Sequence, residues 1–362
     1  MRKRIVKNYN IHDILTFQIV CDDGNDYLPD FNFPFSYFEV ESVQDPDIIL
    51  NVGPFKPNNS ECDIVFRKYH IKKDYIYCRE QEGLAKWQVE INGIETEEII
   101  INFCWIHKSL RGVVAPNNFS QVVYLESLID YILAKKGYCL LHVAAVCNDE
   151  NEALLFSGRS GSSKTSAIAY SINNLEYSYL GDDKIIIKNG IAYSFLRYFG
   201  LFNHLLVSDY SKEHGTFIEK IKAAVFIMKR SHKLMSKFNI AEQGEIRSIS
   251  LVDKVQGSIS DLTKVSDHYD ATTCSLINNN LAESLCNLNN TSDLDIPNYF
   301  FDMMCAYSYI FHNRSSFNFP ETNDIIKESI PKIVEIFKIV NLKANFRTYF
   351  SELQKEHCYS RR

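Results

Sequence analysis

Residues 153–165 read Ala153-Leu154-Leu155-Phe156-Ser157-Gly158-Arg159-Ser160-Gly161-Ser162-Ser163-Lys164-Thr165. An apolar run of strand length leads into a loop rich in glycine and serine, and a helical pattern begins at Lys164. Phosphate-binding loops follow the pattern GxxxxGK[ST], in which Gly158, Lys164 and Thr165 fit and Ser163 replaces the second glycine. The stretch therefore predicts a strand–loop–helix unit that binds phosphate. The alternative is a Ser/Gly-rich turn with an incidental lysine.

In such a loop, successive backbone N–H groups point into one concavity, and the helix N-terminus adds positive potential. Lys164 would neutralise charge on the β- and γ-phosphates, and Thr165 would hold Mg²⁺. Ser163 can supply its N–H as glycine would if its φ is negative, whereas a positive φ would cost about 1 kcal/mol or more. The residues expected to bind the nucleotide are Gly158, Arg159, Ser160, Gly161, Ser162, Ser163, Lys164, Thr165 and Ser166.

Two aspartates, Asp182 and Asp183, follow the next predicted strand, 177–180. Because ligands of open α/β sheets bind beyond the carboxyl ends of the strands, we expect this pair and the loop to share one edge. One carboxylate would hold Mg²⁺, and the other would accept a proton from a substrate hydroxyl. A solvated turn is the alternative. His142 lies in another predicted strand, 139–146, where a lone histidine is ordinarily a packed core residue.

The remaining pattern predicts an α/β protein with a β-rich N-terminal domain, residues 1–115, and a second domain, residues 116–362. A helix is expected from Ser120 to about Lys136, and Asn189-Gly190 predicts a tight hairpin between two isoleucine-rich runs. A late helix after Ser329 would give the chain a helical C-terminal segment. Short β-branched and aromatic runs indicate N-terminal strands at 48–52, 64–66, 75–78, 87–91 and 99–103.

Composition narrows the function classes. The 362 residues carry 39 basic and 45 acidic side chains, a net charge of −6, which does not favour a general nucleic-acid binder. No apolar run approaches the roughly 20 residues of a membrane helix, so a cytoplasmic protein without membrane contact is expected. The ten cysteines show no CxxC spacing, which favours free buried thiols over disulfides or a metal site.

Three elements together resemble HPr kinase/phosphorylase and related serine kinases, whose fold is similar to that of phosphoenolpyruvate carboxykinase. They are His142 in its apolar run, the loop from Gly158 to Thr165, and Leu180-Gly181-Asp182-Asp183, in that order. The resemblance covers residues 138–230 and does not extend to the long C-terminal signature of true HPr kinases. It implies a P-loop kinase domain of this kind in the C-terminal part of the chain.

The resemblance also implies ATP and Mg²⁺ as cofactors and a hydroxyl acceptor, such as a serine of a peptide or protein or a small alcohol. By the family pattern, Asp182 would be the general base, and Asp183 would assist through the metal. Lys164 and His142 would complete the catalytic group, with Thr165 as a further metal ligand. Members of the family often form oligomers, so a homo-oligomer is compatible with the resemblance.

Several alternatives remain open at this point. Ser163 departs from the loop pattern, and the stretch 194–201 lacks the glutamate that HPr kinases carry as a metal ligand. Both departures motivate a nucleotide-dependent switch or binding module with little transfer activity. Carboxykinase-like chemistry would need a further metal site and a cluster of arginines that bind the substrate. A purely structural interaction protein would require that the loop matches the phosphate-binding pattern by chance.

Overall fold

The structure is a computed structural model that describes residues 4–22, 35–65, 69–107, 120–158, 161–182, 184–196, 239–253, 261–266, 296–312, 335–341 and 347–351. It is a mixed α/β chain made of two compact units. Unit 1 comprises Met1–Lys136 with Cys286–Glu321, and unit 2 comprises Gly137–Leu285 with Thr322–Arg362. The sequence predicted a domain boundary after residue 115. In the structure, the N-terminal unit continues to Lys136 and also includes Cys286–Glu321.

Unit 1 is built on a nine-stranded sheet of order β3-β1-β2-β4-β9-β8-β7-β6-β5. Strands β2, β4 and β9 pair in parallel, and the other pairs are antiparallel. The five strands expected from the N-terminal sequence are confirmed. The bounds are β1 (Arg4–Ile11), β2 (Leu15–Asp22), β3 (Glu39–Val40), β4 (Ile48–Val52), β5 (Asp63–Val65), β6 (Tyr69–Lys72), β7 (Tyr75–Glu82), β8 (Ala85–Asn92) and β9 (Ile99–His107), with a 3-10 turn at Ser36–Phe38.

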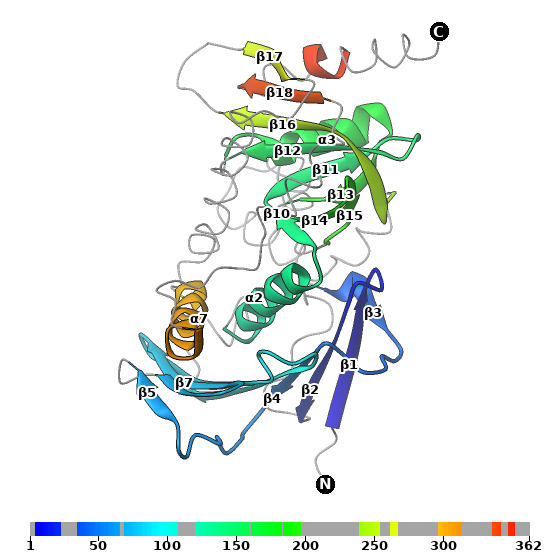
Figure 1. Ribbon diagram of the computed structural model, residues 1–362. Coiled ribbons are helices and arrows are strands. Elements are labelled where there is room, and N and C mark those ends of the chain that lie inside the picture. Colours follow the sequence, from blue (N-terminus) through cyan, green and yellow to red (C-terminus); the bar gives the residue numbers. More distant parts are fainter. Residues whose placement is uncertain are drawn as a thin grey trace, which may run out of the picture. The chain divides into compact units, whose positions relative to one another are not determined.

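Two helices, α2 (Ser120–Lys135) and α7 (Ile296–His312), lie over the same face of this sheet (Figure 1). The strands turn their apolar residues to that face: Ile48, Leu50 and Val52 of β4 are buried, and the residues between them are half-buried. This period of two matches the pleat of a strand. The helix expected from Ser120 is confirmed, and Gly137 follows it with φ 75°, the left-handed conformation that ends many helices.

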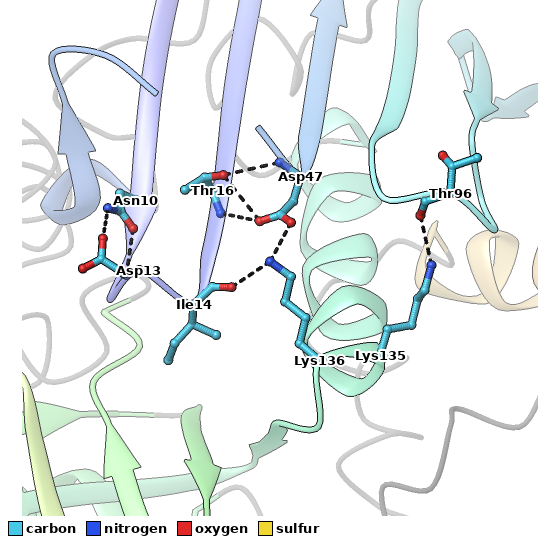
Figure 2. Close-up of polar contacts among 8 residues, drawn as sticks. All are labelled: Asn10, Asp13, Ile14, Thr16, Asp47, Thr96, Lys135 and Lys136. Carbon is cyan, nitrogen blue, oxygen red and sulfur yellow. Dashed lines mark hydrogen bonds and ion pairs between the residues drawn. The ribbon is translucent and has the colours of Figure 1, made fainter. Parts of the chain in front are cut away.

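The end of α2 is fixed to the sheet by two lysines (Figure 2). Lys136 Nζ lies 2.6 Å from Asp47 Oδ1 and donates a hydrogen bond to the Ile14 carbonyl at 2.9 Å. The other oxygen of Asp47 accepts the Thr16 N–H at 2.8 Å. Lys135 donates to the Thr96 carbonyl at 3.1 Å. These bonds hold the helix terminus against the turns that connect the central strands.

The opposite face of the unit 1 sheet carries a row of polar side chains centred on Glu90. Glu90 is 5% exposed, and its carboxylate accepts hydrogen bonds from Tyr75 Oη (2.8 Å), Asn102 Nδ2 (2.7 Å) and the Asn58 N–H (3.1 Å). Asn51 in turn donates to Asn102 at 2.9 Å. The row therefore joins four neighbouring strands and binds the segment that follows β4.

Unit 2 is built on a second nine-stranded sheet, whose main path is β10-β14-β15-β16-β12-β11-β13, with β18 beside β16 and β17 beside β18. Helix α3 packs against β11, β12 and β13. The bounds are β10 (Cys139–Leu141), β11 (Val143–Cys147), β12 (Glu152–Gly158), α3 (Lys164–Leu175), β13 (Ser178–Gly181), β14 (Ile185–Lys188), β15 (Ile191–Tyr193), β16 (Gln243–Asp253), β17 (Asp261–Ser266) and β18 (Glu335–Val340).

Four strands of unit 2 end at one edge of the sheet. Strand β12 is parallel to β16, and β16 is parallel to β18. Strand β11 is antiparallel to both β12 and β13, so β13 also runs in the direction of β12. The carboxyl ends of β13, β12, β16 and β18 consequently lie along the same edge, with Asp182, the loop after Gly158, Asp253 and Asn341 at their tips.

The predicted late helix is wrong for residues 335–340, which form strand β18. Its residues include Phe337 and Val340, and aromatic and β-branched residues of this kind are common in strands. The parallel partner β16 satisfies the backbone groups, and Phe337 and Ile339 are buried. Helical structure in this part of the chain is found at residues 347–351, where Tyr349 packs on Phe156.

The seven cysteines among the described residues are all free thiols. Five of the seven are buried, as expected from their apolar surroundings. Burial, with a smaller contribution from the nearby Glu152 carboxylate, raises the pKa of Cys147 to about 11. In the described part of the chain, the helices are too short or too polar to cross a membrane.

Replacing Glu90 with alanine should destabilise unit 1 by about 2–4 kcal/mol, because the buried Tyr75 hydroxyl and the part-buried donors of Asn102 and Asn58 lose their acceptor. Both tryptophans of the chain, Trp87 and Trp105, lie in unit 1, so denaturant titration followed by tryptophan fluorescence reports on this unit. The exposed Glu97→Ala is the matched control and should change the free energy of unfolding by under about 0.5 kcal/mol. Equal effects of the two substitutions would contradict the assignment.

Candidate functional site

The predicted strand–loop–helix unit is confirmed. Strand β12 ends at Gly158, and α3 begins at Lys164. Two residues of the connection adopt the left-handed conformation, Gly161 at φ 80° and Ser163 at φ 78°. Ser163 is the residue directly before the helix. Arg159 and Ser160, which we also expected to bind phosphate, lie outside the described residues.

Ser163 therefore does not meet the condition of a negative φ. Its conformation is the one that a glycine at this position of the pattern would adopt without strain. A serine there costs about 1 kcal/mol or more in backbone energy. Ser163 therefore departs from the loop pattern in residue type, whereas its backbone keeps the conformation that suits glycine.

Gly158 is required by a close approach of two backbones. A Cβ atom at this position would lie 2.2 Å from the Val252 carbonyl oxygen of the neighbouring strand β16 and 2.9 Å from Ser162 Oγ. Because the first of these atoms belongs to the backbone, it cannot move aside without shifting a central strand. Ser162 is 4% exposed, and within the described part of the chain its hydroxyl has no hydrogen-bond partner. A buried hydroxyl of this kind is stabilised by a ligand atom that bonds to it.

Lys164 is the first residue of α3 and is 8% exposed. Its ammonium group donates a hydrogen bond to the Gly158 carbonyl, so the side chain folds back along the loop. Burying an ammonium group is costly unless it is paired. Phosphate oxygens are stronger acceptors for a lysine than a neutral carbonyl because charge assists the bond. The position and charge of Lys164 are those expected of a phosphate-binding lysine.

Thr165 and Asp182 are brought together from two separate elements. The Thr165 hydroxyl lies 3.0 Å and 3.3 Å from the two carboxylate oxygens of Asp182, to which it donates. Asp182 follows β13 and is 6% exposed. Mg²⁺ characteristically takes one or two protein oxygens and completes its shell with water and substrate phosphates. A hydroxyl and a carboxylate at this separation suit such an ion.

His142 lies at the same edge as the loop. The strand predicted over 139–146 is interrupted at this residue, where the chain leaves its pairing with β14 and joins β12 and β13. In the antiparallel register Val143 pairs with Ser157, so His142 stands at the level of Gly158. The side chain is partly exposed. Asp183, expected to assist through the metal, lies outside the described residues.

Sequence reasoning missed the end of β16. This strand supplies the carbonyl that packs on Gly158, and it ends in a carboxylate, Asp253, at the same edge as the loop. The signal was the mixed run Ile246–Val252, in which isoleucine, leucine and valine are interspersed with Arg247 and two serines, followed directly by an aspartate. The pairing of this strand with β12 is not visible in the sequence. Among the residues that the structure describes, no three His, Cys, Asp or Glu side chains gather as a ready metal site.

Comparison of the sequence with models of known families and with curated proteins finds no match. The site is therefore interpreted from its own geometry and from the resemblance of its motifs.

Replacing Ser163 with glycine should stabilise unit 2 by about 1 kcal/mol, because glycine adopts the observed φ without strain. Ser166→Gly, inside the first turn of α3, is the matched control and should destabilise by about 1 kcal/mol. Denaturant titration followed by far-UV circular dichroism measures both. A loss of stability in Ser163→Gly would show that the left-handed conformation is not strained in solution.

Proposed function

We propose that the protein is an ATP- and Mg²⁺-dependent phosphotransferase that acts on a hydroxyl group. The acceptor class is a serine of a peptide or protein, or a small alcohol. The observation that carries the proposal is the hydrogen bond between Thr165, in the first turn of α3, and the buried carboxylate of Asp182. This bond supports the proposal because a hydroxyl and a carboxylate, two groups that could hold Mg²⁺, meet beside the loop that follows Gly158.

The loop fits a chain of phosphates in three respects. Lys164 supplies a buried cation, and the first turn of α3 supplies N–H groups that have no acceptor within the helix. Ser162 supplies a buried hydroxyl that has no hydrogen-bond partner among the described residues. All three are donors or positive charges, and they lie within seven residues of Gly158. This set would bind the β- and γ-phosphates of a nucleotide.

Mg²⁺ would neutralise charge on the phosphate oxygens, and Thr165 and Asp182 are the described residues that would hold it. The protein's own contribution to phosphoryl transfer is positioning and electrostatic stabilisation. Lys164 holds a positive charge at the loop. Asp182 can also accept the proton of an acceptor hydroxyl, since its carboxylate lies at the edge that an acceptor would approach. His142 would line the same pocket, and Asp183 would act as a further ligand.

A kinase domain like that of HPr kinase, related in fold to phosphoenolpyruvate carboxykinase, is part of this proposal. It is supported by the order of His142, the loop and Asp182 along the chain and by their arrangement at one edge of the unit 2 sheet. The left-handed Ser163 supports it as well, because the loop keeps the backbone conformation of the pattern despite the substitution. We propose a cytoplasmic enzyme, and unit 1 is a candidate for acceptor recognition.

Replacing Asp182 with asparagine should reduce phosphoryl transfer from γ-labelled ATP by about 100-fold or more, because the substitution removes both a metal ligand and a proton acceptor. Asparagine has the same shape and can still accept the Thr165 hydrogen bond, so the fold should persist. Transfer is measured to water, to serine-containing peptides and to small alcohols.

Asp149→Asn, an exposed aspartate of the same unit, is the matched control and should keep full activity. Unchanged transfer by Asp182→Asn would remove this carboxylate from the reaction. If the natural protein binds Mg·ATP tightly but neither hydrolyses it nor transfers phosphate, the result favours a nucleotide-dependent switch instead.

A further inference from the structure

The environment of the Ser162 side chain is unfavourable while the loop is empty. The side chain is 4% exposed, and its hydroxyl finds no hydrogen-bond partner in the described part of the chain. By contrast, the hydroxyl of Ser171, a fully buried serine of α3, donates to the Ala167 carbonyl at 2.8 Å. A buried hydroxyl without a partner lowers stability, because it has lost its bonds to water and gained none in return. An alanine at position 162 would avoid this cost.

The direction of the Ser162 hydroxyl is fixed by its approach to Gly158. Its oxygen lies 2.9 Å from the place that a Cβ atom of Gly158 would occupy, so the side chain reaches back across the loop to the end of β12. The Lys164 ammonium group donates to the Gly158 carbonyl from the other side of Ser163. Two buried hydrogen-bond donors therefore converge on the residue where the loop begins.

The N-terminus of α3 is without the cap that a serine at this position ordinarily provides. Ser163 is the N-cap residue, but its φ is 78°, and its side chain makes no capping hydrogen bond. The Ala167 N–H donates to the Ser163 carbonyl, whereas the N–H groups before it have no acceptor within the helix. An uncapped helix N-terminus favours a bound anion. The uncapped turn and the Ser162 hydroxyl thus both call for an acceptor at the same loop.

We infer that the Ser162 hydroxyl donates a hydrogen bond to a phosphate oxygen, and that this residue stabilises the folded chain only when the loop is occupied. The inference rests on the proposed function and assigns Ser162 a role that the loop pattern does not demand, since any residue can stand at that position. A phosphate oxygen is charged, which strengthens each bond that it accepts. The chemical class that Ser162 recognises is the phosphate chain itself, whatever group the chain carries.

The test measures stability and binding in one variant of the full chain, Ser162→Ala. Thermal unfolding without ligand, followed by far-UV circular dichroism, should show a midpoint about 2–4 °C higher, because the variant no longer buries a hydroxyl without a partner. Titration calorimetry should show about ten-fold weaker binding of both Mg·ATP and Mg·tripolyphosphate, the loss expected for one hydrogen bond to a charged group. A purely structural role would not move stability and affinity in opposite directions.

Ser171→Ala is the matched control, because it makes the same change at a buried hydroxyl of α3 that has a partner, and it should leave both affinities unchanged. Unchanged affinities in Ser162→Ala would overturn the inference while leaving the loop as a phosphate site. A lower unfolding midpoint, or a loss of affinity confined to Mg·ATP, would also overturn it, since the hydroxyl would then bond within the chain or contact the nucleoside. Failure of the natural chain to bind either probe would instead refute the proposed function.

Discussion

The hydrogen bond from the Thr165 hydroxyl to the Asp182 carboxylate joins the first turn of α3 to the end of β13. Strand β11 lies between β12 and β13, so this bond crosses over the end of β11. It can form only if β12 and β13 end at the same level of the sheet. The burial of Asp182 makes its partner important, since a carboxylate removed from water is costly without a hydrogen bond. The site depends on this alignment of three neighbouring strands.

Two backbone constraints give the loop its form. Gly158 has no space for a side chain beside the Val252 carbonyl, so the backbones of β12 and β16 lie close together where the loop begins. Ser163 holds a positive φ immediately before α3 and so turns the chain into the helix at a cost of about 1 kcal/mol. Strain that persists at a strand–helix turn is typical of functional loops. Here it accompanies a buried lysine and a buried hydroxyl.

The local features of unit 2 could be predicted from the sequence because each has a short-range cause. The Asn189-Gly190 hairpin is confirmed, with both residues at positive φ, since few other residue pairs suit that turn. The strand–loop–helix unit and Asp182 at its side are confirmed for the same reason. The helix predicted after Ser329 is wrong over β18 because Phe337 and Val340 have helical spacing but are residue types that strands also favour, and only the pairing with β16 decides between the two structures.

Long-range pairing accounts for what the sequence did not show. The break at His142 arises because the chain changes neighbours there, and Asp253 joins the edge because β16 pairs with β12. Strand β14 is far from β10 in the sequence, and β16 is far from β12. The extent of unit 1 has the same cause, because α7 returns to the sheet from far along the chain.

The binding of Mg·ATP to the natural chain and to Lys164→Met, measured by calorimetry, tests most directly whether the loop holds phosphates. Methionine keeps the length and apolar stem of the side chain but removes its charge. We expect the natural chain to bind and the variant to lose about 100-fold in affinity, as removal of charge-assisted hydrogen bonds requires. Lys188→Met, on the β14–β15 hairpin, should bind normally. Equal affinities in the natural chain and Lys164→Met, or no binding by the natural chain, would contradict a phosphate-binding loop.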